Sequence, residues 1–148
     1  MNATSQRCIW SAADLRGWDI PAETKVFLMT TGLPHRLGES TIEFGIFDEC
    51  HVIGCDYECP VFVTPDGSVW RQPDEGEPAF MNSSVMLLSR FIEISEAFDV
   101  VCHEDSSLDI GLEIDRWQRM LTDTDPTAMT RSGAIWPQIV DSARATLS

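Results

Sequence analysis

The segment VFVTPDGSVW, residues 61–70, decides the fold of this chain because it places two short β-prone runs around a chain reversal. Proline presets φ for the first corner of a turn, and glycine supplies the positive φ that a tight reversal often needs. Val61, Val63 and Val69 alternate with Phe62 and Trp70. This period of two predicts a β-hairpin with one face buried more deeply than the other.

Similar β-prone runs lie on both sides of the hairpin and are separated by turn residues. Short runs punctuated in this way are typical of an antiparallel meander. The predicted strands are Ile42–Phe47, His51–Cys55, Pro60–Thr64, Ser68–Arg71 and Ala79–Met81.

Helical spacing of apolar residues replaces this alternation outside the meander. A first helix that starts at Pro21 is predicted over Ala22–Thr31, before Gly32, with Val26, Phe27 and either Leu28 or Met29 facing the core. Asn82-Ser83-Ser84 is predicted to cap a second helix that runs to about Phe98, followed by a break at Asp105-Ser106-Ser107. The remaining predictions are a helical turn over Ser11–Arg16 and helices over Leu108–Leu121, from Asp125-Pro126 and over Ile135–Thr146.

The order of helix, sheet and helices predicts an α+β fold with a central antiparallel sheet of about four to six strands. The length of 148 residues suits one domain over residues 1–148, of which we expect residues 1–10 to be poorly ordered. Met1–Trp10 lacks the apolar run of a signal peptide, and no stretch approaches the roughly 20 apolar residues of a membrane span. Five cysteines without a regular framework suit a reducing compartment. We therefore expect a cytoplasmic protein without disulfides.

The charge of the chain is negative and unevenly distributed. The net charge is −14, and residues 39–115 hold 18 carboxylates against Arg71 and Arg90, which leaves −16 in this part. Nucleic acids and anionic lipids are bound through lysine and arginine, so this balance disfavours both as direct partners. Two interpretations remain: the acidity keeps the protein soluble, or it steers the protein toward a basic partner.

The best metal candidates in the sequence are Cys50, His51, Cys55 and Cys59, because thiolates and imidazoles are zinc ligands. Their spacing does not match the paired pattern of structural zinc sites. Cysteines that fill strand positions as small apolar residues explain the pattern better, so no metal and no cofactor is predicted. Adjacent Cys-His pairs supply the residue types of a thiol enzyme but face different ways, and no common catalytic motif is present. We therefore predict that the chain is not an enzyme.

Acidic residues in the turns of the meander are the candidate partner contacts. Loops at sheet edges are exposed and commonly carry binding residues. Trp70 joins them as a possible aromatic anchor, although a core position is the alternative for this side chain. The carboxylates are Asp48, Glu49, Asp56, Glu58, Asp74, Glu75 and Glu77.

Several short motifs occur in an order that resembles the SUKH superfamily, and in particular its fourth group of immunity proteins. The resemblance runs from about Asp14 to Leu147, and the cysteine cluster and the acidic middle depart from it. The motifs are Phe27-Leu28, Gly32-Leu33-Pro34, Asp66-Gly67-Ser68-Val69-Trp70, Phe80-Met81-Asn82-Ser83-Ser84 followed by Leu88 and Phe91, and Trp136 with Ile139.

This resemblance implies an α+β fold and a function in bacterial polymorphic toxin systems, where such proteins neutralise toxins that are often nucleases or nucleic-acid deaminases. It transfers no catalytic residue. The leading hypothesis is an immunity protein that binds a cognate toxin with a basic surface. The alternative is a non-catalytic regulatory or scaffold module of the same fold.

Overall fold

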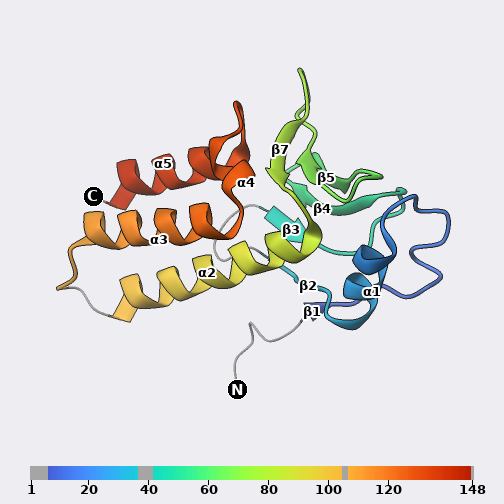
Figure 1. Ribbon diagram of the computed structural model, residues 1–148, viewed down its shortest axis with the longest axis horizontal. Helices are drawn as coiled ribbons and strands as arrows, with labels where there is room; N and C mark the ends of the chain where they lie inside the picture. The colour runs from blue at the N-terminus through green and yellow to red at the C-terminus, as the bar shows by residue number, and fades with distance from the viewer. Residues whose placement is uncertain (1–6, 37–41, 105–106, 148) are drawn as a thin grey trace.

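The computed structural model describes residues 7–36, 42–104 and 107–147 of the chain (Figure 1). Five of its strands form one antiparallel sheet, and each strand pairs with the next one along the chain. The meander predicted from the turn residues is therefore confirmed. Its strands are β3 (Ile42–Phe44), β4 (Val52–Asp56), β5 (Cys59–Val63), β6 (Val69–Arg71) and β7 (Ala79–Asn82).

The hairpin over residues 61–70 joins β5 to β6 as predicted. Gly67 has a φ of 94°, and its N–H donates to the carbonyl of Thr64 at 2.8 Å, which closes the turn. Val61, Val63 and Val69 are at most 1% exposed, whereas Phe62 and Trp70 on the opposite face are only half-buried. The alternation in the sequence thus separates a core face from an outer face.

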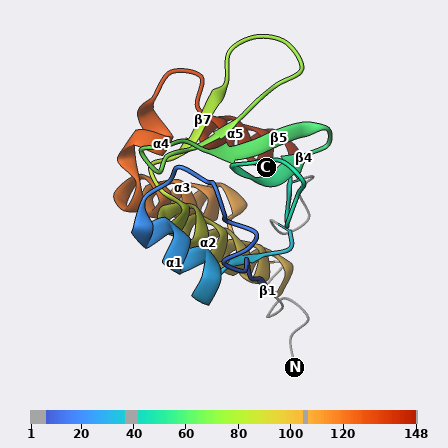
Figure 2. The ribbon, with the colours of Figure 1, turned by 90° about the vertical axis from the view of Figure 1, so that its right-hand side faces the viewer.

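The helices cover the core face of the sheet. In Figure 2, α1 (Ala22–Thr30) and α2 (Val85–Glu104) lie on the same side of the strands. Farther from the sheet, α3 (Ile110–Thr124) lies between α2 and α5 (Ile135–Leu147), and α4 (Pro126–Thr130) connects α3 to α5 beside β7 (Figure 1). No helix in the described ranges is long and apolar enough to cross a bilayer.

Most of the apolar residues that recur at helical spacing on the long helices are buried, whereas Ile110, Ile139 and Ala143 are half-buried. Side chains of α2 and α3 meet in the core, where Phe98 stacks on Trp117 at 4.4 Å between ring centroids. Phe91 and Trp136 make an edge-to-face contact between α2 and α5. The buried residues of these stripes are Val85, Leu88, Phe91, Ile92, Phe98, Ile114, Trp117, Leu121, Trp136 and Val140.

A small second sheet was not predicted. Its strands β1 (Arg7–Cys8) and β2 (Leu33–Pro34) have two residues each and are too short to show a pattern. Gly32 precedes β2 with a φ of 66°, and a Cβ there would lie 2.0 Å from the carbonyl oxygen of Cys8. Trp10, two residues after β1, is 1% exposed. The segment before the first helix therefore belongs to the core.

Three sequence predictions need correction. Val26 is 54% exposed, because the short α1 helix buries only the stripe of Thr24 and Leu28. Helix α2 continues six residues past Phe98 to Glu104, since no glycine or proline interrupts it. Strand β3 ends at Phe44 rather than Phe47. The predicted break at 105–107 falls partly on residues 105–106, outside the described residues.

The predicted cap before α2 has a more specific structure. Ser84 alone caps the helix, because its Oγ accepts from the N–H of Leu87 at 3.1 Å. Asn82 and Ser83 instead bind the buried carboxylate of Asp125 between α3 and α4. Asn82 also accepts a hydrogen bond from the indole N–H of Trp136 at 2.9 Å. This buried polar network joins the end of the sheet to the C-terminal helices.

Candidate functional site

The connections of the meander lie alternately at its two ends, and this divides the acidic candidates into two groups. The β3–β4 loop and the β5–β6 turn lie at one end, with Asp48 and Glu49 in the first of these. The β4–β5 turn and the β6–β7 loop lie at the other end, and in Figure 1 the β6–β7 loop rises above β7. We call this second group the acidic end: Glu58, Asp74, Glu75 and Glu77.

Backbone hydrogen bonds bring the two segments of the acidic end together. The N–H of Gln72 donates to the carbonyl of Pro60 at 2.9 Å, so the β6–β7 loop begins beside the β4–β5 turn. The side-chain amide of Gln72 then donates to the carbonyls of Pro73 and Gly76. These bonds hold the first half of the loop, which begins beside the turn that contains Glu58.

All four side chains of the acidic end are exposed, and none forms an ion pair within the described residues. Exposed carboxylates without a nearby cation produce a negative potential that extends about one Debye length, roughly 8–10 Å, into solution. This end of the sheet therefore attracts cationic groups.

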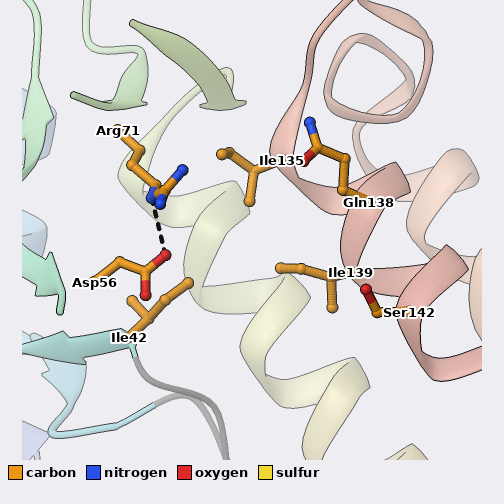
Figure 3. Close-up of a pocket in the computed structure, with 7 residues that line it drawn as sticks. All are labelled: Ile42, Asp56, Arg71, Ile135, Gln138, Ile139 and Ser142. Carbon is orange, nitrogen blue, oxygen red and sulfur yellow. Dashed lines mark ion pairs between the residues drawn. The ribbon is translucent and has the colours of Figure 1, made fainter. Parts of the chain in front are cut away.

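Asp56 differs from its acidic neighbours because its charge is compensated within the fold. Its carboxylate lies 2.8 Å from the Nε of Arg71, and the two side chains are 15% and 27% exposed. The pair lines a groove of about 300 Å³ between the core face of the sheet and α5 (Figure 3). The other residues that line the groove are Ile42, Ile135, Gln138, Ile139 and Ser142.

Trp70 lies on the outer face of the sheet and is half-buried there. It pairs with Phe62 on β5 and contacts the ring of Phe80 edge-to-face at 5.2 Å. The guanidinium of Arg131, from the α4–α5 connection, lies 4.7 Å from the Trp70 ring centroid. The indole N–H donates to Ser68 at 2.8 Å. Trp70 is thus part of a fixed aromatic row with some exposed surface, and the β6–β7 loop begins two residues later.

The opposite end of the sheet is attached to the N-terminal segment. His51 stacks on Trp18 with 5.7 Å between centroids, and its Nε2 accepts from the N–H of Asp19 at 3.0 Å. The thiol of Cys50 lies 3.7 Å from the carbonyl of Gly17. These contacts give Cys50 and His51 a structural role at this end.

The cysteine-rich segment does not form a metal site among the described residues, where no three candidate ligands come together. Cys59 is buried in β5, and all five cysteines of the chain are free thiols. The Cys55 thiol donates to the carbonyl of Tyr57. Burial raises the pKa of the Cys55 thiol, and the carboxylate of Asp56 raises it further. A high pKa disfavours the thiolate that metal binding or nucleophilic catalysis requires.

The Cys102-His103 pair on α2 has no catalytic geometry. Burial raises the pKa of the Cys102 thiol, and Asp99 adds to this effect. The Nδ1 of His103 lies 2.7 Å from the carbonyl of Asp99 in the preceding helical turn. Consecutive side chains on a helix point about 100° apart, so the histidine is not placed to accept the proton of its neighbour.

Tyr57 is a surface residue that the sequence prediction missed. It occupies the first position of the two-residue β4–β5 turn, and its side chain is 76% exposed. Its φ of 58° lies in the left-handed region, which costs a non-glycine residue about 1–2 kcal/mol. The available signal was a lone tyrosine between two carboxylates in a short connection, at Asp56-Tyr57-Glu58.

The comparison with protein families identifies the family of this chain. The family model described as SUKH-4 immunity protein matches residues 7–142, from β1 to the second half of α5. The chain therefore belongs to the SUKH-4 immunity protein family, and this membership supports an immunity function. No curated protein and no solved structure matches the chain.

Proposed function

We propose that this protein neutralises a cognate bacterial toxin by binding a basic surface of the toxin with its acidic end, in the cytoplasm of the producing cell. The observation that carries this proposal is a group of four exposed carboxylates on two adjacent connections of the sheet, none of which forms an ion pair with another described residue. Family membership supports the immunity function, and the position of the charge supports the choice of surface.

Electrostatic attraction gives this surface a kinetic advantage. Charge complementarity can raise association rate constants to about 10⁸–10⁹ M⁻¹s⁻¹ at low salt. A toxin that acts on nucleic acid needs a cationic groove for its substrate. A set of exposed carboxylates at the end of a sheet competes for the same groove. Binding there blocks access to the toxin's active site.

The outer face of the sheet supplies the apolar part of the proposed interface. Protein interfaces combine a central apolar patch with a polar rim, and aromatic residues are enriched in the patch. Phe62 and Trp70 are half-buried in the free protein and lie on strands that lead into the acidic end. They become part of the contact if the toxin extends from the acidic end over this face.

The chain acts in this proposal by binding and not by catalysis. In support, the thiols of Cys55 and Cys102 have raised pKa values, and the carboxylate of Asp56 is paired with Arg71. On α5 the groove beside this pair is lined by aliphatic and amide side chains and by the hydroxyl of Ser142. No histidine lines the described part of the groove, so this hydroxyl has no imidazole base beside it.

A protection experiment tests the proposal. The toxin domain encoded by the neighbouring gene is induced in a host cell with and without this protein, and survival is counted. We expect survival with the wild-type protein and loss of protection when Glu58, Asp74, Glu75 and Glu77 are replaced by lysine. Death of cells that contain both folded proteins would contradict the immunity function and favour the scaffold alternative.

A further inference from the structure

Two residues other than glycine have a positive φ in the described part of the chain, and they differ in the contacts that compensate for this conformation. They are His51, with a φ of 72°, and Tyr57, with a φ of 58°. Left-handed backbone is unfavourable for both side chains, and glycine or asparagine would occupy it at lower cost. A residue that keeps such a conformation needs a compensating interaction.

Contacts within the fold compensate for the left-handed conformation of His51. Its ring stacks on Trp18, and its Nε2 accepts the backbone N–H of Asp19, so the conformation attaches the N-terminal segment to the sheet. Removal of this side chain would break both contacts.

Tyr57 receives no comparable compensation within the described residues. Its ring makes no aromatic contact there, and its hydroxyl makes no hydrogen bond. It is 76% exposed, more than any other large apolar side chain in the described part of the chain. The thiol of Cys55 and the pairing of Asp56 with Cys59 hold the backbone of the turn, and glycine at position 57 would keep both. The exposed aromatic side chain is therefore unfavourable in the free protein.

We infer that Tyr57 is the anchor of the toxin interface and inserts into a pocket lined by arginine or lysine on the basic surface of the toxin. This inference rests on the proposed function. Tyr57 adjoins the acidic end through Glu58, so the same cationic surface that the carboxylates attract meets the phenol ring. Cations bind the face of an aromatic ring, and tyrosine is enriched among the few residues that dominate interface energies.

The stability of two glycine variants separates the roles of the two left-handed residues. We expect Tyr57→Gly to melt at or above the temperature of the wild-type protein, because glycine relieves the strain and the described residues lose no aromatic contact or side-chain hydrogen bond. We expect His51→Gly to melt at a lower temperature, because its stacking contact and hydrogen bond are lost. A lower melting temperature for Tyr57→Gly would show that the tyrosine stabilises the fold, and the inference would be wrong.

Binding is then measured by titration calorimetry with the toxin domain encoded by the neighbouring gene. We expect Tyr57→Gly to weaken Kd about 30-fold, or about 2 kcal/mol at 1.4 kcal/mol per tenfold change, as for a dominant interface residue. Tyr57→Phe retains the ring and should stay within about threefold of the wild type. A loss below about tenfold for Tyr57→Gly, with wild-type binding intact, overturns this inference and leaves the proposed function standing. Absence of wild-type binding overturns both.

Nitration provides a second readout, because Tyr57 is the only tyrosine in the chain. The nitrated residue is identified by peptide mass spectrometry in the free protein and in the complex. We expect Tyr57 to be modified in the free protein and protected in the complex. Equal modification in both states would place the ring outside the interface.

Discussion

Replacement of Asp125 by alanine tests the network that attaches the C-terminal helices to the sheet. The carboxylate is 2% exposed and accepts three hydrogen bonds. One comes from the Nδ2 of Asn82 at 3.2 Å, and two come from the N–H and Oγ of Ser83, each at 2.8 Å. Alanine removes the acceptor for all three donors. The buried side-chain amide of Asn82 then has no water to replace the lost carboxylate.

The expected loss follows from the burial of these donors. A buried donor without an acceptor costs about 1–3 kcal/mol, and hydrogen bonds to charged groups contribute about 1.5–3 kcal/mol each. Asn82 is fully buried and bears the full penalty, whereas the half-buried Ser83 regains water as a partner. We expect the free energy of unfolding to fall by about 4 kcal/mol, and the melting temperature by roughly 12 °C for a domain of this size.

Urea denaturation followed by tryptophan fluorescence measures this loss, because the network includes the indole of Trp136. The matched control is Asp123→Ala, which removes the same charge from an exposed position two residues earlier. It should change the free energy of unfolding by less than about 0.5 kcal/mol. If the free energy of unfolding of Asp125→Ala were within about 1 kcal/mol of the wild-type value, the network would not hold the C-terminal helices on the sheet.

Two further predictions concern the turns. The carboxylate of Asp66 accepts hydrogen bonds from the hydroxyl of Thr64 and from the N–H and hydroxyl of Ser68. These bonds lower the pKa of Asp66 from 3.8 to about 2. The carboxylate therefore stabilises the fold above pH 3.8, and this stabilisation is lost as the pH falls toward 2. Asp66→Asn should remove that part of the acid-induced loss of stability, and an NMR titration that placed the Asp66 midpoint near 4 would contradict the hydrogen-bond geometry. Gly32→Ala should destabilise the protein by about 3 kcal/mol or more, since its Cβ would meet the carbonyl of Cys8. The control is Gly76→Ala, which is also at positive φ but has no atom within 4 Å of the new Cβ. It should lower the free energy of unfolding by only about 1–2 kcal/mol in the same thermal melts. Equal losses of stability for the two variants would contradict the close approach at Gly32.

Local patterns in the sequence predicted most of the fold. The alternation of Val61 and Val63 around the turn at Gly67 identified the central hairpin, and the helical spacing of Leu88, Phe91 and Ile92 identified the buried face of α2. These signals lie within one element, so no knowledge of the tertiary structure was required.

Long-range contacts were not predictable in the same way. The strand pairing of Arg7–Cys8 with Leu33–Pro34 joins segments about 25 residues apart and leaves no period in either of them. Val26 looked like a core residue because its neighbours are apolar, and only the position of α1 on the body decides which stripe is buried. The end of α2 was missed because the helix buries no residue after Phe98, so the inward stripe that identifies it stops there.

The candidate surface was predictable in composition but not in arrangement. The turn residues identified loops with carboxylates, whereas the strand order was needed to separate Asp48 and Glu49 from the acidic end. The ion pair of Asp56 with Arg71 depends on side-chain direction across two strands. The left-handed conformation of Tyr57 depends on the length of the β4–β5 turn, which the sequence did not fix.

The role of the acidic end in toxin binding is tested by the association rate constant with the toxin domain, measured at low salt for two charge-reversed variants. One variant replaces the acidic end, Glu58, Asp74, Glu75 and Glu77, by lysine, and the other replaces four exposed carboxylates elsewhere, Glu23, Glu104, Asp123 and Asp141. Both variants have the same net charge, so any difference between them reports the position of the charge. We expect a drop of about 100-fold or more for the first variant and a much smaller drop for the second. Equal drops would show that net charge alone explains the attraction, and the proposed surface would be wrong.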